Sequence, residues 1–389
     1  MAKKKLLKGN EAFAVAAIQA GCRQYFGYPI TPQNEVPEYM SREMAKAGGS
    51  FVQAESELAS ISLLYGASAA GGRCLTSSSS PGIALMQEGI GSIIMCQLPC
   101  VIINVMRGGP GIGSIQPAQA DYNQVTRGGF NGDGHVFVYA PSSIQEAMDM
   151  IYNSFDVADE YRNPVIVCVD GMIGQMMEPV VIPPAKEPVK EEDIPKIKPW
   201  ALTGHKDKRL RNKLNSVWLA HEELEERTLE FWPKYEKAER ELADWEEYNL
   251  EGADAVFVSF GSTSRVAREA IDLLEKEGIK IGMIRPKTLW PFPKKAFESI
   301  DNNTTKMIIS VELSMGQMLQ DVKLASEGKY PTGLINRVGG MMLDPIEIVD
   351  RTKKLLKDLD NGIRQESAIF EPVANSCGDL DTVTGGIKE

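Results

Sequence analysis

The sequence predicts an α/β protein built from two doubly wound parallel-sheet domains. Short apolar runs rich in β-branched residues, such as VIINV and VIVCV, alternate with amphipathic helical patterns. Apolar strands separated by helices are typical of a parallel sheet that is covered on both faces. The chain has 389 residues, and a stretch rich in proline and charge interrupts the alternation near its middle. Because a single core stops growing well below this length, we expect two domains.

The first α/β unit is expected to occupy residues 1–180. Its expected helices cover residues 10–21, 57–70, 83–95 and 144–160. Its expected strands are contained in residues 24–32, 73–82, 99–106, 136–143 and 164–170. A long glycine-rich loop runs from Arg107 to about His135, and loops of this length in compact domains are usually functional.

Residues 181–252 are predicted to form a linker followed by a charged helical insert. Proline and charged residues dominate as far as residue 200, as is typical of a linker. Residues 221–252 combine dense Glu, Lys and Arg with Leu, Phe and Trp. This second pattern predicts a solvated or interface helix that Pro233 interrupts.

The second α/β unit is expected to occupy residues 253–364. It opens with the apolar run AVFV, and an amphipathic helical pattern follows it as far as Gly278. Glycine is a common stop for a helix because it tolerates the left-handed conformation. The tail, residues 365–389, has no clear period and is either an interface arm or a loosely ordered terminus.

The net charge excludes some classes of function. The formal charge is −11 at pH 7 and the pI is about 5.1, so the summed field repels nucleic acid and anionic lipid surfaces. The basic start of the chain lacks the apolar core of a signal peptide. No apolar run approaches the roughly 18 residues that a membrane span needs. We expect a cytoplasmic protein.

The six cysteines predict no metal site. They lie at positions 22, 74, 96, 100, 168 and 377, without the paired CxxC spacing of zinc or iron–sulfur ligation. Most lie in apolar runs, where thiols usually act as small buried hydrophobes. Iron–sulfur clusters, if the reaction needs them, are expected on another chain.

The motif GYPITP is the first candidate for chemistry. Two prolines flank Thr31 at the end of a predicted strand, where ligands enter doubly wound sheets. A rigid loop could therefore aim the Thr31 hydroxyl into a cleft. The alternative is a structural proline-rich turn.

A carboxylate at the start of the helix 57–70 is the second candidate. Glu57 precedes small and apolar side chains, so it is expected near the wall of a partly dry pocket, where it could share a proton with a ligand nitrogen. Glu55 is a competing candidate. One of the two acids could simply be a solvated residue that the helix dipole favours.

Two further segments could bind anions. The turn TSSSSPG at residues 76–82 places hydroxyls and backbone N–H groups at a helix start, although a plain strand-to-helix turn is an equal alternative. Arg107 follows an apolar strand and precedes a glycine-rich segment. Its planar guanidinium could dock a small carboxylate with two hydrogen bonds. A structural salt bridge is the alternative.

These features, in this order, resemble the alpha subunit of 2-oxoacid:ferredoxin oxidoreductases. The matching segments span nearly the whole chain except the charged insert and the tail. They are YPITP at 28–32, VQAESELA at 52–59, SSSPGIALMQEGI at 78–90, VMRGGPGIG at 105–113, QADYNQV at 119–125, APSSIQEA at 140–147, YRNPVIV at 161–167, GQMMEP at 174–179, FVSFGSTSRVAREAI at 257–271, IRPKTLWPFP at 284–293 and VELSMGQM at 311–318.

The resemblance implies the identity of each domain and the cofactors. The first domain would be the pyrimidine-binding domain of a thiamine-diphosphate enzyme, and the second a transketolase C-terminal-like domain. A separate beta subunit would hold the diphosphate, its Mg²⁺ and a [4Fe-4S] cluster. Gamma and ferredoxin-like delta subunits would complete a dimerised hetero-oligomer that donates electrons to ferredoxin.

The resemblance also implies roles for single residues. In related enzymes a glutamate nine residues before a glycine bonds the aminopyrimidine ring, and Glu57 with Gly66 has this spacing, whereas Glu55 does not. Thr31 and Arg107 would bind the substrate carboxylate. Further cofactor contacts would come from Tyr28, Pro29, Ile30, Ser79 and Pro81.

The implied reaction is the oxidative decarboxylation of a 2-oxoacid with coenzyme A, yielding an acyl-CoA and CO₂. Residues 108–126 contain no Lys or Arg to neutralise a distal carboxylate, and GIGSIQPAQADYN resembles the branched-chain, 2-oxoisovalerate type. The alternatives are a 2-oxoglutarate or pyruvate enzyme, another thiamine-dependent class such as a transketolase-like subunit, and a non-catalytic scaffold for the cofactor-bearing subunit.

Overall fold

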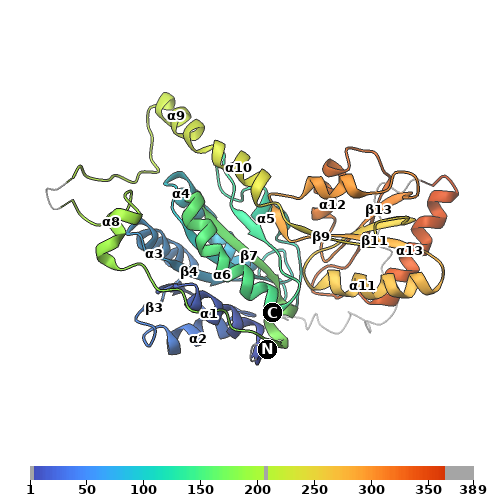
Figure 1. Cartoon of the computed structure of the whole chain (residues 1–389), viewed down its shortest axis with the longest axis horizontal. Coiled ribbons are helices and arrows are strands. Elements are labelled where there is room, and N and C mark those ends of the chain that lie inside the picture. Colours follow the sequence, from blue (N-terminus) through green and yellow to red (C-terminus); the bar gives the residue numbers. More distant parts are fainter. Residues whose placement is uncertain (1–3, 206–208, 364–389) are drawn as a thin grey trace, which may run out of the picture.

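The computed structural model describes residues 4–205 and 209–363. It contains two mainly parallel sheets that lie side by side, each with helices on both faces (Figure 1). The predicted fold class is therefore confirmed. The predicted tail, residues 365–389, lies outside the described residues.

The first sheet has seven strands in the order β12-β6-β7-β5-β4-β2-β3. All are parallel except β12, which pairs antiparallel with β6. The strands are β2 (Gln24–Gly27), β3 (Ser50–Gln53), β4 (Cys74–Ser78), β5 (Cys100–Met106), β6 (Phe137–Tyr139), β7 (Pro164–Asp170) and β12 (Thr288–Trp290). The prediction lacked β3 and β12, which are short and lie at the two edges.

Alternating side chains of the central strand β5 pack into two separate hydrophobic cores. Val101, Ile103 and Val105 pack on one face, beneath α1 (Gly9–Gln19), α2 (Glu35–Glu43), α6 (Ile144–Tyr161) and α7 (Gly171–Gln175). Ile102 and Met106 pack on the other face, beneath α3 (Glu57–Ala69) and α4 (Ser80–Met95). This alternation follows from the two-residue period of a strand and leaves the sheet covered on both faces.

The second sheet has five strands in the order β14-β13-β10-β11-β9. They are β9 (Trp245–Tyr248), β10 (Ala255–Val258), β11 (Ile281–Pro286), β13 (Met307–Glu312) and β14 (Thr332–Asn336). Helices α11 (Gly261–Lys276) and α13 (Pro345–Asp360) cover one face. On the other face, Val256, Val258 and Ile308 join α12 (Gln317–Ala325) in the same core that packs beneath α3 and α4. The two domains therefore share one continuous core.

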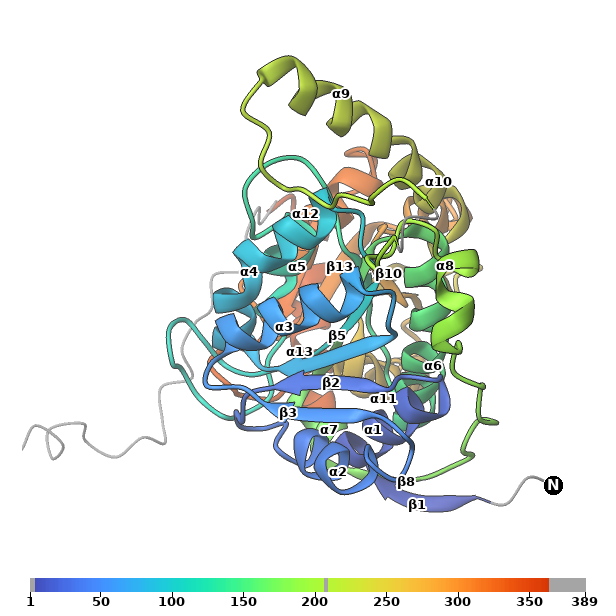
Figure 2. The same cartoon turned by 90° about the vertical axis from the view of Figure 1, so that its left-hand side faces the viewer.

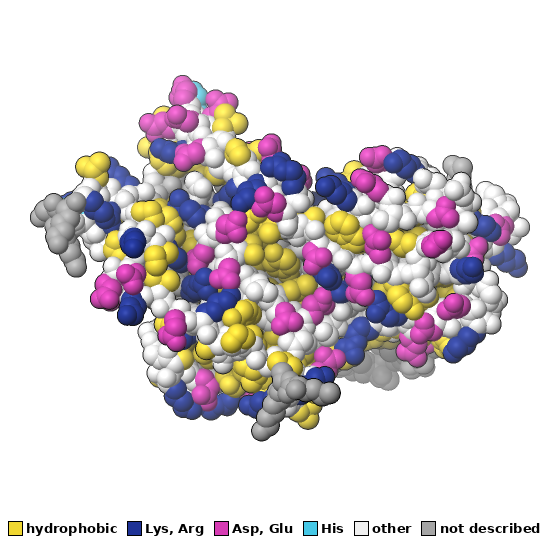
Figure 3. Space-filling model, in the orientation of Figure 1, with side chains coloured by type: hydrophobic (Ala, Val, Ile, Leu, Met, Phe, Trp, Pro, Cys, Tyr) yellow, Lys and Arg dark blue, Asp and Glu magenta, His cyan; other side chains and the backbone are white. Residues whose placement is uncertain are grey.

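The charged insert contains two helices, α9 (His221–Phe231) and α10 (Pro233–Glu241), which meet near Pro233 as predicted. α10 packs against the first domain, where the Tyr235 hydroxyl donates to Asn163 Oδ1 at 3.2 Å. α9 projects from the body of the molecule in both orientations (Figures 1 and 2). Acidic side chains gather on this projection, whereas acidic and basic groups are interspersed over the rest of the visible face (Figure 3).

The helical interpretation of residues 221–252 was wrong at one segment. Trp245–Tyr248 is the edge strand β9, which pairs antiparallel with β11. Its polar sequence WEEY suits an edge that is half exposed. A second pair of strands, β1 (Lys5–Lys8) and β8 (Met177–Val180), was also missed and forms a separate antiparallel ribbon. In both cases the partner strand is distant in the sequence, so local periodicity carries no signal of the pairing.

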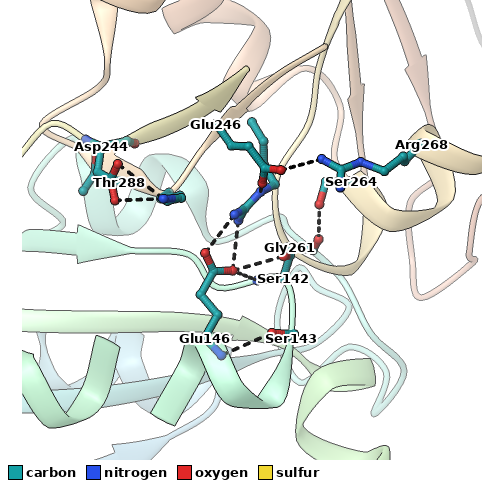
Figure 4. A network of polar contacts seen from close by, with 11 residues as sticks. Ser142, Ser143, Glu146, Asp244, Glu246, Gly261, Ser264, Arg268 and Thr288 are labelled. Carbon is teal, nitrogen blue, oxygen red and sulfur yellow. Dashed lines mark hydrogen bonds and ion pairs between the residues drawn. The ribbon is translucent and has the colours of Figure 1, made fainter. Parts of the chain in front are cut away.

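A buried arginine joins the two domains. Arg285, at the end of β11, donates to both carboxylate oxygens of Glu146 at 2.8 and 3.0 Å and to Glu246 at 2.9 Å. Glu146 lies in the first turn of α6, near the N-cap residue Ser143 (Figure 4). Glu246 also accepts a hydrogen bond from Arg268 Nη2 at 2.7 Å. The two-pronged geometry matches the planar guanidinium to a carboxylate.

No helix in the described ranges combines the length and apolar character that a membrane crossing requires.

We expect Glu146→Gln to lower the free energy of unfolding by about 3 kcal/mol, because it removes one carboxylate from a buried charge pair and leaves the guanidinium only partly compensated. Urea denaturation of the purified chain measures this change. Lys237→Gln is the control, because its ion pair with Glu160 lies on the surface and is expected to contribute less than about 1 kcal/mol.

The pH dependence of the same variant provides an independent check. Burial opposes ionisation of Glu146, but the hydrogen bonds and charge of Arg285 outweigh it and hold the pKa of this carboxyl below its ordinary 4.5. Its contribution is therefore complete above pH 4.5 and is lost as the pH falls through the lower folded value. Wild type should lose stability more steeply than Glu146→Gln on acidification below pH 4.5; parallel curves would contradict the assignment.

Candidate active site

The segments predicted to carry chemistry meet at one edge of the first sheet. They follow strands β2, β3, β4 and β5, which are parallel and lie next to one another. The carboxyl ends of parallel strands face the same edge, which is where doubly wound folds bind ligands. The structure therefore brings together the loop containing Thr31, the start of α3 at Glu57, the serine turn before α4, and Arg107.

Glu57 is the first residue of α3, and its environment distinguishes it from Glu55. The N-cap residue Ser56 accepts a hydrogen bond from Ala59 N at 3.2 Å, which fixes the start of the helix. The Glu57 side chain is only 6% exposed, whereas Glu55 is exposed. In the part of the chain that the structure describes, no group donates a hydrogen bond to the Glu57 carboxylate. A carboxylate without a donor is free to accept a hydrogen bond from a ligand.

A glycine in the first turn of α4 provides the space that Glu57 occupies. A Cβ atom placed on Gly82 would lie 2.7 Å from Glu57 Oε1 and 2.0 Å from Ser78 Oγ. The residue type at position 82 is therefore required for close approach of α3 and α4, rather than for an unusual backbone conformation.

The serine turn next to Gly82 presents polar atoms without partners. Ser78 Oγ and Ser79 Oγ are buried and form no hydrogen bond with any described residue. Ser79 is the N-cap residue of α4, yet its side chain does not cap the helix, and Pro81 follows in the first turn, half-buried. Buried polar groups are almost always satisfied in folded proteins, so these hydroxyls indicate a place where a polar ligand binds.

Arg107 is buried and anchors two loops. Its side chain is 7% exposed, with Nη1 donating to the carbonyl oxygen of Thr31 and Nη2 to that of Ile112, both at 2.8 Å. Its Nε–H has no partner among the described residues. Thr31 and Arg107 are thus in direct contact, as their predicted common role requires, but the contact is to the backbone of Thr31. The predicted alternative for Arg107, a structural salt bridge, does not occur among the ion pairs of the described residues.

Sequence analysis missed the polar network behind Arg107. Asp121 accepts hydrogen bonds from Ser80 Oγ at 2.6 Å and from Asn104 Nδ2 at 2.9 Å, and Ser80 Oγ also accepts from the backbone N–H of Arg107. Burial raises the pKa of Asp121 above its ordinary 3.8, although these two donors and the charge of Arg107 oppose the rise. The available signal was Asn104, a lone amide within the apolar strand CVIINVM.

Hydrogen bonds from three side chains anchor the loop after β2. Asn10 Nδ2 and Gln175 Nε2 both donate to the carbonyl oxygen of Pro32 at 2.7 Å, and Ser77 Oγ donates to Gln33 Oε1 at 2.6 Å. In the same loop, Tyr28 and Pro29 are exposed and Ile30 is half-buried. The predicted cofactor contacts at 28–30 therefore lie on an accessible surface.

The glycine-rich loop is fastened to the second domain. Gln119 Nε2 donates to Phe260 O at 2.8 Å, and Gln119 Oε1 accepts from Leu313 N at 3.1 Å. Asp170, at the end of β7, accepts from Ser262 N at 2.7 Å. These buried contacts join the second domain to the glycine-rich loop and to the carboxyl end of β7.

Aliphatic side chains are exposed around Glu57 on helices α3 and α4 and on strand β3. Leu58 and Leu85 are each 50% exposed, and Leu63 and Val52 are also exposed. Helices α3 and α4 lie on the face that is turned toward the viewer in Figure 2. Exposed apolar side chains on elements next to Glu57 are groups that another polypeptide could cover.

Comparisons with known proteins give consistent results. Residues 15–244 match the family described as pyruvate flavodoxin/ferredoxin oxidoreductase, thiamine diphosphate-binding, and residues 253–348 match pyruvate:ferredoxin oxidoreductase core domain II. Ketoisovalerate oxidoreductase subunit VorB of Methanothermobacter thermautotrophicus is 42% identical over 91% of this chain and 98% of that protein. 2-Oxoglutarate synthase subunit KorA of Methanocaldococcus jannaschii is 34% identical over 89% of this chain and 98% of that protein.

Solved structures share the fold. A 2-oxoglutarate:ferredoxin oxidoreductase from Magnetococcus marinus with 2-oxoglutarate, coenzyme A and succinyl-CoA bound has a TM-score of 0.77 and 28% identity, covering 91% of this chain and 66% of that one. A split-gene transketolase has a TM-score of 0.55 at 14% identity over 92% of this chain and 99% of that one, which shows similarity of fold alone.

Two glycine substitutions should have opposite effects on stability. Gly82→Ala places a methyl group against Ser78 Oγ and Glu57 Oε1, so it should lower the free energy of unfolding by about 1 to 3 kcal/mol. Gly66→Ala, within α3, meets no atom within 4 Å and should raise it by up to about 1 kcal/mol. Urea denaturation distinguishes the two, and equal stabilities would show that α3 and α4 do not meet closely at Gly82.

Proposed function

The chain belongs to the thiamine-diphosphate-dependent 2-oxoacid:ferredoxin oxidoreductases, and we propose that it is the alpha subunit of an enzyme for branched-chain 2-oxoacids of the 2-oxoisovalerate type. The reaction is oxidative decarboxylation with coenzyme A to an acyl-CoA and CO₂, with electrons passing to ferredoxin. The observation that carries the catalytic role is Glu57, a largely buried residue whose carboxylate has no donor among the described residues and which lies next to Gly82, as does the unpaired hydroxyl of Ser78. The 42% identity to ketoisovalerate oxidoreductase subunits supports the substrate class.

The polar groups around Glu57 fit the aminopyrimidine end of thiamine diphosphate. That ring offers nitrogen acceptors and an amino donor, and the chain offers a carboxylate and two free hydroxyls, Ser78 Oγ and Ser79 Oγ. Tyr28, Pro29, Ile30 and Pro81 would line the ring from the neighbouring loops. When bound, the cofactor supplies a nucleophilic carbon for the 2-oxo group and accepts the electron pair that decarboxylation releases.

The role of Glu57 is to share a proton at the ring nitrogen N1′. Burial lowers the local dielectric and thereby strengthens a hydrogen bond to the carboxylate. The start of α3 favours a negative charge at this position. A carboxyl group that is placed by a helix start and by the packing of Gly82 holds one geometry, as proton transfer requires.

Arg107 and Thr31 would bind the carboxylate of the 2-oxoacid. Nη1 and Nη2 are each committed to one backbone carbonyl, so Nε–H and the remaining N–H groups are the donors left for an anion. Because the same guanidinium fixes the Thr31 carbonyl, a substrate carboxylate bound there would meet a preformed site.

Other subunits complete the enzyme in this proposal. A beta subunit would hold the diphosphate, Mg²⁺ and a [4Fe-4S] cluster, and gamma and delta subunits would complete the path to ferredoxin. The exposed aliphatic side chains around Glu57 support coverage of this edge by a partner. The cytoplasmic location expected from the sequence remains part of the proposal. The main alternative is a 2-oxoglutarate enzyme, which the 34% identity to KorA favours.

Glu57→Gln should lower kcat of the assembled complex at least about 100-fold, because the amide cannot take part in proton transfer at N1′. The measurement is reduction of a viologen dye by the co-purified complex with 2-oxoisovalerate and coenzyme A. Glu55→Gln is the matched control and should retain activity, since Glu55 is exposed. A Glu57→Gln complex that assembles and remains fully active would instead support a scaffold role for this chain.

Arg107→Lys should raise KM for the oxoacid about 10-fold with a smaller effect on kcat. A single ammonium group cannot hold the carbonyls of Thr31 and Ile112 and also present a two-pronged donor to an anion. Arg265→Lys, at an exposed ion pair with Glu178, is the control. An unaltered KM in Arg107→Lys would remove Arg107 from the substrate site.

A further inference from the structure

A pocket of about 410 Å³ lies beside Thr31, where the first domain meets the second. Its size falls within the usual range for small-molecule sites. The walls come from the loop after β2, the start of α2, the glycine-rich loop, α7, and the segment before α13. The lining residues that matter for chemistry are Thr31, Glu35, Ile115, Pro117, Met172 and Met342.

One wall of the pocket is apolar and adaptable. Ile115 is 57% exposed and Met172 is 40% exposed, and both line the pocket together with the half-buried Met342 from the second domain. Methionine side chains are flexible and polarisable, so they adjust to a branched alkyl group. The burial of such a group against them is favourable in proportion to its apolar area.

The opposite wall carries the carboxylate of an ion pair, in which Glu35 is paired with Lys8. Burial opposes ionisation of Glu35, but hydrogen bonds from Lys8 and Asn10 outweigh it and lower the pKa of the Glu35 carboxyl. Glu35 is therefore ionised at neutral pH. Lys8 is engaged in an ion pair with Glu35 and does not line the pocket.

We propose that this pocket receives the side chain of the 2-oxoacid, and that Glu35 discriminates against substrates with a distal carboxylate. Ile115, Met172 and Met342 would contact an aliphatic side chain, whereas a second carboxylate in the same place would meet Glu35 and find no cation among the described lining residues, because Glu35 already holds the charge of Lys8. Like-charge juxtaposition is a common device for rejecting a wrong ligand. The inference rests on the proposed function, because only a substrate carboxylate held near Thr31, which lines the pocket, would bring the side chain to it.

Glu35 also supports the loop that carries Thr31, which affects the choice of variants. Asn10 Nδ2 donates to Glu35 Oε2 at 2.7 Å, and the same amide donates to Pro32 O. Glutamine at position 35 keeps the size and an acceptor for Asn10 while it removes the charge. Met172 lies on the other wall and is well exposed, so a lysine there tests the same electrostatic argument without disturbing this loop.

The experiment compares two substrates in the complete enzyme complex. Glu35→Gln should raise the ratio of kcat/KM for 2-oxoglutarate to that for 2-oxoisovalerate about 10-fold or more, since like-charge repulsion is removed and Lys8 loses its partner. Glu43→Gln is the matched control, because Glu43 lies on the same helix in exposed ion pairs with Arg42 and Lys46. Its ratio should equal that of wild type.

Met172→Lys should shift the ratio in the same direction by a similar factor and should raise KM for 2-oxoisovalerate. If wild type oxidises 2-oxoisovalerate but neither variant shifts the ratio, the subsite is wrong and the proposed function stands. If the wild-type complex oxidises no branched-chain 2-oxoacid, the proposed function itself fails. If Glu35→Gln does not assemble, the Met172→Lys ratio decides: a shift supports the subsite and an unchanged ratio overturns it.

Discussion

Buried hydrogen bonds that hold the glycine-rich loop between two sheets determine the geometry of the whole edge. Gln119 pairs with the backbone on both sides, to Phe260 and Leu313, and Asp121 is locked by Ser80 and Asn104. These contacts place Arg107, and Arg107 in turn fixes the carbonyl of Thr31. A loop of this length would otherwise be mobile; here its polar groups are satisfied from two domains. The positions of Arg107, of the Thr31 loop and of the neighbouring pocket all follow from this arrangement.

In the proposed enzyme, this site supplies only part of the groups that the reaction needs. Glu57 and the unpaired serine hydroxyls lie at an edge bordered by exposed aliphatic side chains. The groups proposed for proton exchange and for orientation of a substrate all lie at strand ends and helix starts. The rest of the cofactor requires groups that would come from a partner in the proposed enzyme. In such an enzyme each polypeptide supplies some of the reacting groups, so the reaction depends on assembly of the subunits.

Much of this architecture could be predicted from sequence because it is local. Apolar runs and helical periods located the central strands and helices. The choice of Glu57 over Glu55 came from the resemblance to related enzymes, and the structure shows that the two acids differ in burial. The missed features depend on distant partners. The local sequence of the edge strand Trp245–Tyr248 resembles a charged helix, and its partner β11 is distant in the sequence. Asp121 forms its hydrogen bonds only when β5 and α4 pack next to it. Glu35 lines a pocket only because the second domain lies beside α2.

Two edge strands pair across the boundary at residue 253. β12, at residues 288–290, leaves the second domain and pairs with β6 of the first, while β9, which precedes residue 253, belongs to the second sheet. A chimaera made by joining the first half of this chain to the second half of a relative at residue 253 would inherit two foreign edge pairings. A chimaera that keeps both pairings intact needs a junction upstream of β9 and a β6 strand that matches the new β12.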